Sequence, residues 1–194
     1  MTDPMEGLLA ALDLTDTGAR TSEDIFTGPS QWTPGGRVFG GQVLAGIDHP
    51  VAQFWANGRA FDLRHIESPI YFEVAGEPVP HQAVWMKAVG ELPDDRNLHR
   101  AALAYASDYS ILEPVLRGHG VPWGTPGLKV ASLDHAMWWH RFGRADQWLL
   151  YTQESPTAIG GRGLSLGRIF TRDGLLLASV AQEGTIRVPT GAAG

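Results

Sequence analysis

The chain has 194 residues, which suits one domain or one domain with an appendage. Hydrophobic residues make up 43% and charged residues 19%, so the composition is that of an ordinary folded protein rather than a disordered one. The absence of cysteine excludes disulfides, thiolate metal sites and a cysteine nucleophile, and the net charge of -6 excludes a basic footprint for nucleic acid.

The N-terminal residues predict a short helix. Asp3 can cap it, Pro4 suits the first helical position, and Glu6 stands at capping-box spacing. A short apolar face would follow from Leu8, Leu9 and Leu12. These acidic residues stand where a signal peptide carries Lys or Arg, and no stretch approaches about 20 apolar residues, so neither a signal peptide nor a membrane span is expected. The lack of cysteine fits a reducing compartment, and we expect the cytoplasm.

Residues 15–36 are polar and rich in turn-forming residues, and residues 37–46 form a short apolar element with a glycine hinge. The glycine pairs Gly35-Gly36 and Gly40-Gly41 lack the spacing of a dinucleotide or nucleotide phosphate loop, so no phosphate-binding loop is predicted.

The rest of the chain predicts one long helix among strands. Strands are expected over 61–66 and 83–89, and a helix over 94–112, where Pro93 and two acids precede apolar residues at helical spacing. Further strands are expected over 130–140, 148–155, 165–171 and 175–188, with Asp173-Gly174 as a hairpin turn between the last two. Helix and strands do not alternate, so the fold class is α+β, with a long helix packed across an antiparallel sheet.

The segment Gly163-Leu164-Ser165-Leu166-Gly167 matches the G-x-S-x-G pattern of serine hydrolases. That pattern needs a helix after the serine and a histidine later in the chain, but a strand is expected after Ser165 and all seven histidines precede it. We therefore interpret the segment as a glycine-rich strand. His135 and His140 suggest a metal site, but five residues of spacing along a strand put them on opposite faces, which favours simple packing.

Asp108 falls in the last turns of the predicted helix, where the helix dipole makes a carboxylate unfavourable. A surface position and a functional role both stay open for it. Gln182 is an amide on an otherwise apolar strand, and Ser132 stands near the start of its strand.

Six segments taken together resemble the TesB-like (type II) acyl-CoA thioesterases, a double-hotdog family. The segments are Arg37–Gln42, Leu92–Asp95, Leu103–Asp108, Ser132–Trp138, Trp148–Tyr151 and Ser179–Gly184. The resemblance implies a hotdog fold, an acyl-CoA substrate, no cofactor and no metal. It also implies a catalytic set of Asp108, Ser132 and Gln182, which would orient and activate a water molecule.

The resemblance covers the second hotdog of the family from about residue 59 to 188, whereas most of the first hotdog is missing. We therefore expect one complete hotdog at 59–188, a remnant of the first at 1–58 and a flexible tail at 189–194. A single hotdog would leave its partner surface bare, which predicts a homo-oligomer, most simply a dimer. One alternative is a non-catalytic acyl-CoA-binding or interaction protein. A hydratase on the same fold ranks lower, since no histidine matches its catalytic position.

Overall fold

The computed structural model describes residues 3–12, 15–16, 26–27 and 59–189. The expectations for the apolar element at 37–46, the two glycine pairs and the tail at 190–194 therefore lie outside the described residues. The helices and strands are α1 (Pro4–Leu12), β1 (Thr15–Asp16), β2 (Phe26–Thr27), β3 (Phe61–His65), β4 (His81–Ala88), α3 (Arg96–Ser107), α4 (Glu113–Gly118), β5 (Lys129–Ser132), β6 (Ala136–Trp139), β7 (Leu149–Ile159), β8 (Arg162–Thr171) and β9 (Leu176–Arg187).

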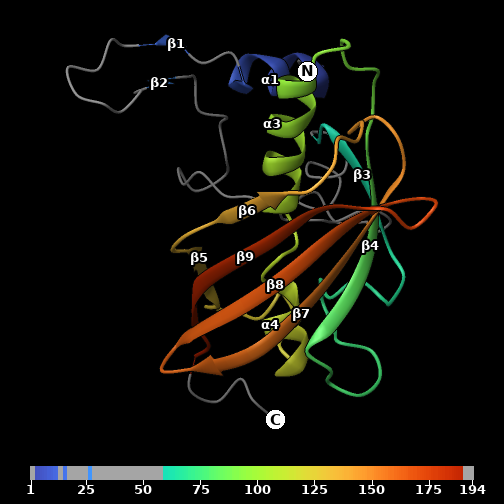
Figure 1. Ribbon diagram of the computed structural model, residues 1–194. Coiled ribbons are helices and arrows are strands. Elements are labelled where there is room, and N and C mark those ends of the chain that lie inside the picture. The colour runs from blue at the N-terminus through green and yellow to red at the C-terminus, as the bar shows by residue number, and fades with distance from the viewer. Residues whose placement is uncertain (1–2, 13–14, 17–25, 28–58, 190–194) are drawn as a thin grey trace.

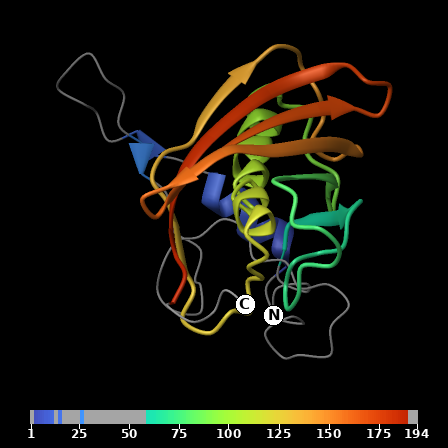
Figure 2. The ribbon, with the colours of Figure 1, turned by 90° about the horizontal axis from the view of Figure 1, so that it is seen from below.

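A seven-stranded antiparallel sheet curves around helix α3 (Figures 1 and 2). The strand order is β3-β4-β7-β8-β9-β5, and β6 also pairs with β9, so β5 and β6 share one edge. The main core lies between the concave face of the sheet and α3, whose buried side chains include Ala102, Leu103 and Ala106. The α+β prediction, with one long helix on an antiparallel sheet, is confirmed. Among the described residues, no helix is long and apolar enough to cross a membrane.

The N-terminal helix forms as its capping residues predict. Asp3 Oδ1 accepts a hydrogen bond of 2.9 Å from the Met5 backbone N–H, and α1 begins at Pro4. Leu8 is fully buried, and Met5 and Leu12 pack against the main core. This short helix therefore covers part of the core on the α3 side.

The predicted helix over 94–112 is wrong at both ends. It begins at Arg96, because the Asp95 side chain caps it by accepting hydrogen bonds from the backbone of Asn97 and Leu98 at 2.8 and 3.3 Å. It ends at Ser107, and Asp108 is its C-cap. The chain then turns and starts the separate helix α4, which has a proline in its first turn.

The single strand predicted over 130–140 is two strands, β5 and β6, on the same neighbour β9. The break falls at 133–135, where the Asp134 side chain accepts a hydrogen bond of 2.7 Å from the Glu183 backbone N–H. Short polar side chains compete with the strand ladder in this way. The loop stays tied to β9 and holds the end of β5 in place.

Two tight turns join β7, β8 and β9. Gly160 and Gly161 have φ values of +62° and +73°, the left-handed pair that a two-residue hairpin favours. Gly174 has φ +88° in the turn between β8 and β9, which confirms the Asp-Gly hairpin prediction. The last three long strands thus form an antiparallel meander.

Candidate active site

The C-terminal end of α3 places Asp108 under the concave face of β9. Asp108 is half-buried and its backbone caps the helix. The preceding residue is anchored from the sheet, since the Tyr151 hydroxyl donates a hydrogen bond of 3.2 Å to the Ser107 carbonyl. Burial, with a further contribution from the charge of Asp108, raises the pKa of Tyr151 well above its ordinary value of 10. Tyr151 therefore stays a neutral hydroxyl donor over the working pH range.

The three residues predicted as a site converge from three different elements. Gln182 Nε2 on β9 donates to Asp108 Oδ1 at 2.7 Å and to Ser132 Oγ on β5 at 2.7 Å. Ser132 Oγ in turn donates to Asp108 Oδ1 at 3.3 Å. In the sequence these side chains are 24 to 74 residues apart, so the fold alone brings them together.

This group of three side chains is buried on one side and open to solvent on the other. Gln182 is 0% exposed, whereas Ser132 is an exposed residue at the end of β5. A carboxylate can accept a proton from water, a hydroxyl can hold that water in place, and the amide of Gln182 keeps the carboxylate and the hydroxyl together. The arrangement therefore has the groups needed to activate a water molecule that arrives from the open side.

The serine of the G-x-S-x-G segment is not positioned as a nucleophile. Ser165 is fully buried in the middle of β8, with strand on both sides. The flanking glycines have a packing role, since a Cβ at Gly163 would lie 2.6 Å from Val115 Cγ1 and a Cβ at Gly167 would lie 2.5 Å from Tyr151 Cε2. The interpretation as a glycine-rich strand is confirmed.

The two histidines considered for a metal have separate partners. His135 Nε2 lies 3.0 Å from Ser107 Oγ, and His140 Nε2 lies 2.9 Å from Ser179 Oγ. In the part of the chain that the structure describes, no three His, Asp or Glu side chains gather in a way that could hold a metal ion.

A second polar cluster was not predicted. Glu113, at the start of α4, is 0% exposed, and its carboxylate contacts His65 Nε2 at 2.8 Å, Gln82 Nε2 at 2.7 Å and Trp123 Nε1 at 3.1 Å. Gln82 Nε2 also donates to Gln153 Oε1 at 2.8 Å. The available signal was the strand register, because Gln82 shares an inward face with apolar residues on β4.

Burial by itself raises the pKa of the Glu113 carboxyl. The charge of His65 and the hydrogen bonds from His65, Gln82 and Trp123 together outweigh burial, so the pKa lies below the ordinary value of 4.5. Glu113 is therefore a carboxylate held within the fold.

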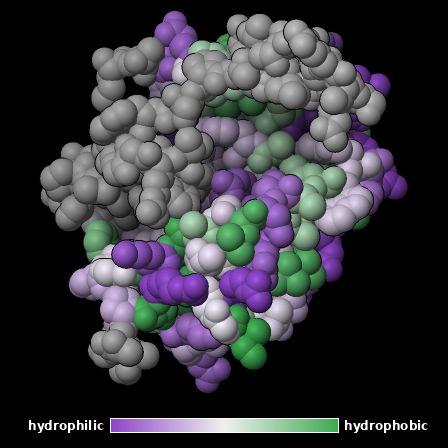
Figure 3. Space-filling model, turned by 90° about the vertical axis from the view of Figure 1, so that its left-hand side faces the viewer, coloured by the Kyte–Doolittle hydropathy of each residue, from purple (hydrophilic) through white to green (hydrophobic). Residues whose placement is uncertain are grey.

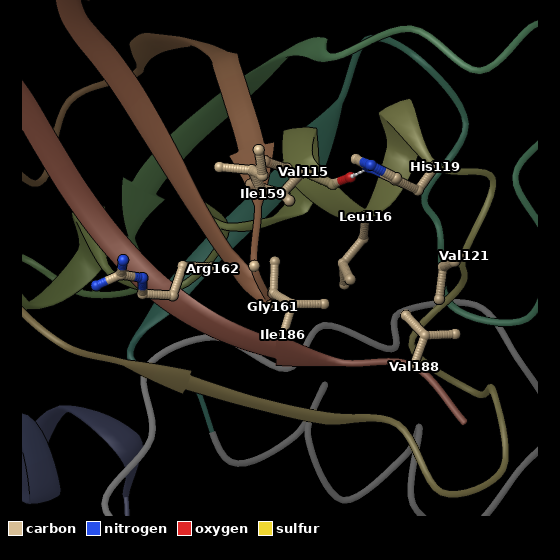
Figure 4. Close-up of a pocket in the computed structure, with 11 residues that line it drawn as sticks. Val115, Leu116, His119, Val121, Ile159, Gly161, Arg162, Ile186 and Val188 are labelled. Atoms are coloured by element: carbon tan, nitrogen blue, oxygen red, sulfur yellow. Dashed lines mark hydrogen bonds between the residues drawn. The ribbon is translucent and has the colours of Figure 1, made fainter. Parts of the chain in front are cut away.

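A mostly apolar hollow of about 260 Å³ lies at the far end of α4 (Figure 4). Along β9 the order is Gln182, then Gly184, then Ile186, which lines the hollow. Leu112 covers Gly184, since a Cβ there would lie 2.5 Å from Leu112 Cδ1. Leu112 thus packs on the β9 residue that lies between Gln182 and Ile186.

A model of the acyl-CoA thioesterase family matches residues 57–185. The chain belongs to this family. Acyl-CoA thioesterase 2 of Haemophilus influenzae is 36% identical over 149 residues, which cover 75% of this chain and 51% of that protein. Acyl-coenzyme A thioesterase 8 of Homo sapiens is 44% identical over 110 residues, 56% of this chain and 34% of that protein. The chain thus spans about half the length, or less, of the curated relatives it matches.

Solved structures agree with the family and with the fold. Acyl-CoA thioesterase II TesB2 from Mycobacterium marinum superposes with a TM-score of 0.54 at 35% identity, covering 92% of this chain and 73% of that chain. A hot dog fold protein from Alicyclobacillus acidocaldarius superposes with a TM-score of 0.55 at 15% identity, covering 89% of this chain and 66% of that chain. The predictions of a TesB-like acyl-CoA thioesterase family and of a hotdog fold are confirmed.

Proposed function

We propose that this protein hydrolyses acyl-CoA thioesters to a free carboxylic acid and CoA. The observation that carries the proposal is the convergence of Asp108, Ser132 and Gln182 in a chain that belongs to the acyl-CoA thioesterase family. The relatives in that family act on acyl-CoA by name, which supports the same substrate class here.

The proposed reaction needs no covalent enzyme intermediate. Asp108 takes a proton from water as the water oxygen attacks the thioester carbonyl carbon. The C–S bond then breaks, the acid leaves with the new C–O bond, and the proton passes from Asp108 to the CoA sulfur. Ser132 Oγ accepts a hydrogen bond from the water beside Asp108, and Gln182 holds Asp108 and Ser132 together, so the two residues supply orientation.

The test is release of free CoA thiol from a panel of acyl-CoAs, from short to long acyl chains, by the purified protein. We expect turnover on at least part of the panel, and the pattern would give the preferred acyl length. Acyl-CoA binding by folded protein without thiol release from any member would contradict the proposed hydrolysis and favour the non-catalytic alternative.

We also propose that copies of the chain associate, with residues 1–58 as the remnant of a first hotdog. Leu133, which follows Ser132 in the break between β5 and β6, and Trp138, on β6, are 52% and 54% exposed along this edge of the sheet, which supports an interface there. Over the described part of the face in Figure 3, apolar side chains are interspersed with polar ones. We keep the cytoplasm as the expected compartment because the chain has no cysteine.

The expected oligomer is a dimer, measured by size-exclusion chromatography with light scattering. Replacing Trp138 with Lys, at the exposed edge, should shift the population toward monomer, whereas the same change at exposed Ile159, the last residue of β7, should not. A monomer at every concentration of the unmodified protein would contradict the association.

A further inference from the structure

Two buried oxygen atoms lie on directly opposed residues of β8 and β9. Ser165 and Gln182 are register partners, and both are 0% exposed. Opposed residues of an antiparallel pair point to the same face of the sheet, which here is the concave face. Within the described residues, neither Ser165 Oγ nor Gln182 Oε1 has a hydrogen-bond partner.

The chemistry of the two atoms is complementary. Gln182 Nε2 is committed to Asp108 and Ser132, so Oε1 is the end of the amide that still needs a donor. A serine hydroxyl is such a donor. Cβ atoms of opposed residues are about 4.5–5.5 Å apart, a gap that rotation of a serine and a glutamine side chain can bridge.

We propose that Ser165 is a positioning residue for the hydrolytic site. Its hydroxyl donates to Gln182 Oε1 and so holds the amide with Nε2 on Asp108 and Ser132. The inference rests on the proposed function, since it gives Ser165 a role only through Gln182.

The physical reason is the cost of a buried acceptor without a donor. If Ser165 supplies the donor, the amide is satisfied at both ends while Nε2 stays in the site. If the donor is removed, the amide becomes more stable when it rotates so that its oxygen reaches another donor, and Nε2 then moves away from Asp108. The serine of the G-x-S-x-G segment thus affects hydrolysis only by holding the Gln182 side chain, and it does not touch substrate.

The first experiment compares Ser165→Ala with Ser155→Ala. We expect Ser165→Ala to lower kcat about tenfold with KM nearly unchanged. Ser155 is the matched control, because it is a buried serine on the neighbouring strand β7 whose hydroxyl bonds to the Leu164 carbonyl at 2.8 Å. Ser155→Ala removes a buried hydroxyl of the same sheet but should leave kcat unchanged. Equal kcat in both variants would overturn the inference.

A double-variant cycle separates positioning from a general structural role. If Ser165 acts through Gln182, adding Ser165→Ala to Gln182→Ala should give no further loss of kcat. A further loss of the full single-variant size would overturn the inference. If Gln182→Ala alone leaves kcat unchanged, the proposed site itself fails. If Gln182→Ala lowers kcat and Ser165→Ala does not, only the present inference fails.

NMR of the Gln182 side chain tests the inference without a kinetic measurement. The side-chain amide signals of Gln182 in a ¹⁵N NMR spectrum should shift in Ser165→Ala and stay in place in Ser155→Ala. Unmoved Gln182 signals in folded Ser165→Ala would overturn the inference without reference to activity.

Discussion

We expect the Asp108→Asn variant to keep its fold and to lose about 10²–10⁴-fold in kcat on acyl-CoA. Asparagine keeps an oxygen that can accept the hydrogen bond from Gln182 Nε2, so the local packing around the helix end stays intact. It cannot accept a proton from water near neutral pH, so the step that activates the nucleophile is lost.

The matched control is Glu183→Gln. Glu183 follows Gln182 on β9, so its side chain points to the opposite face of the sheet, where it pairs with Arg162 at 3.7 Å. The same loss of one negative charge there should leave kcat unchanged. Thiol release gives kcat, and circular dichroism during heating checks the fold. Unchanged kcat in folded Asp108→Asn would remove Asp108 from the role of base.

The second large effect concerns stability rather than turnover. We expect Glu113→Ala to lower the free energy of unfolding by about 3–5 kcal/mol, because removing one member of a buried charged cluster leaves its partners unsatisfied. The partners are His65, Gln82 and Trp123. Denaturant unfolding of the variant and of the unmodified protein measures the difference.

The control for Glu113 is Glu154→Ala, which removes an exposed ion pair with Arg168 at 3.2 Å. That change should cost at most about 1 kcal/mol. If Glu113→Ala lowers the free energy of unfolding no more than Glu154→Ala does, the buried cluster contributes no more to stability than an exposed ion pair.

The same carboxylate gives a pH signature. Because the pKa of Glu113 in the folded chain lies below its ordinary value of 4.5, its contribution is fully present above pH 4.5. The contribution is lost as the pH falls through the folded-state pKa and the carboxylate takes up a proton. The stability difference between Glu113→Ala and the unmodified protein should therefore narrow below pH 4.5.

Local patterns predicted most of the elements. Helical spacing predicted α3, and apolar runs bounded by turn-forming residues predicted most of the strands, because these signals depend on residues within a few positions of one another. The error at 130–140 has a long-range cause, since at the break the Asp134 side chain accepts a hydrogen bond from the backbone N–H of Glu183, which lies 49 residues later. No local pattern contains that partner.

The candidate site, too, was predictable only where local motifs carried the signal. The positions of Asp108, Ser132 and Gln182 came from motifs of a known family, and the structure brings these side chains together. Glu113 was missed because the predicted helix ended at 112 with no element expected directly after it, and because acidic residues are mostly exposed. Its burial depends on His65 and Gln82, which come from two other strands.

The meander of β7, β8 and β9 affects the order in which parts of the molecule fold and unfold. Its two tight turns close loops of few residues, so these strands can pair at a small entropic cost. The strand that carries Gln182 therefore belongs to a part of the sheet that short connections hold together. Its contact with Asp108 joins residues 74 positions apart and needs the whole helix in place. Partial unfolding that frees the helix end would abolish the site while the meander persists, so loss of turnover would precede loss of sheet on heating.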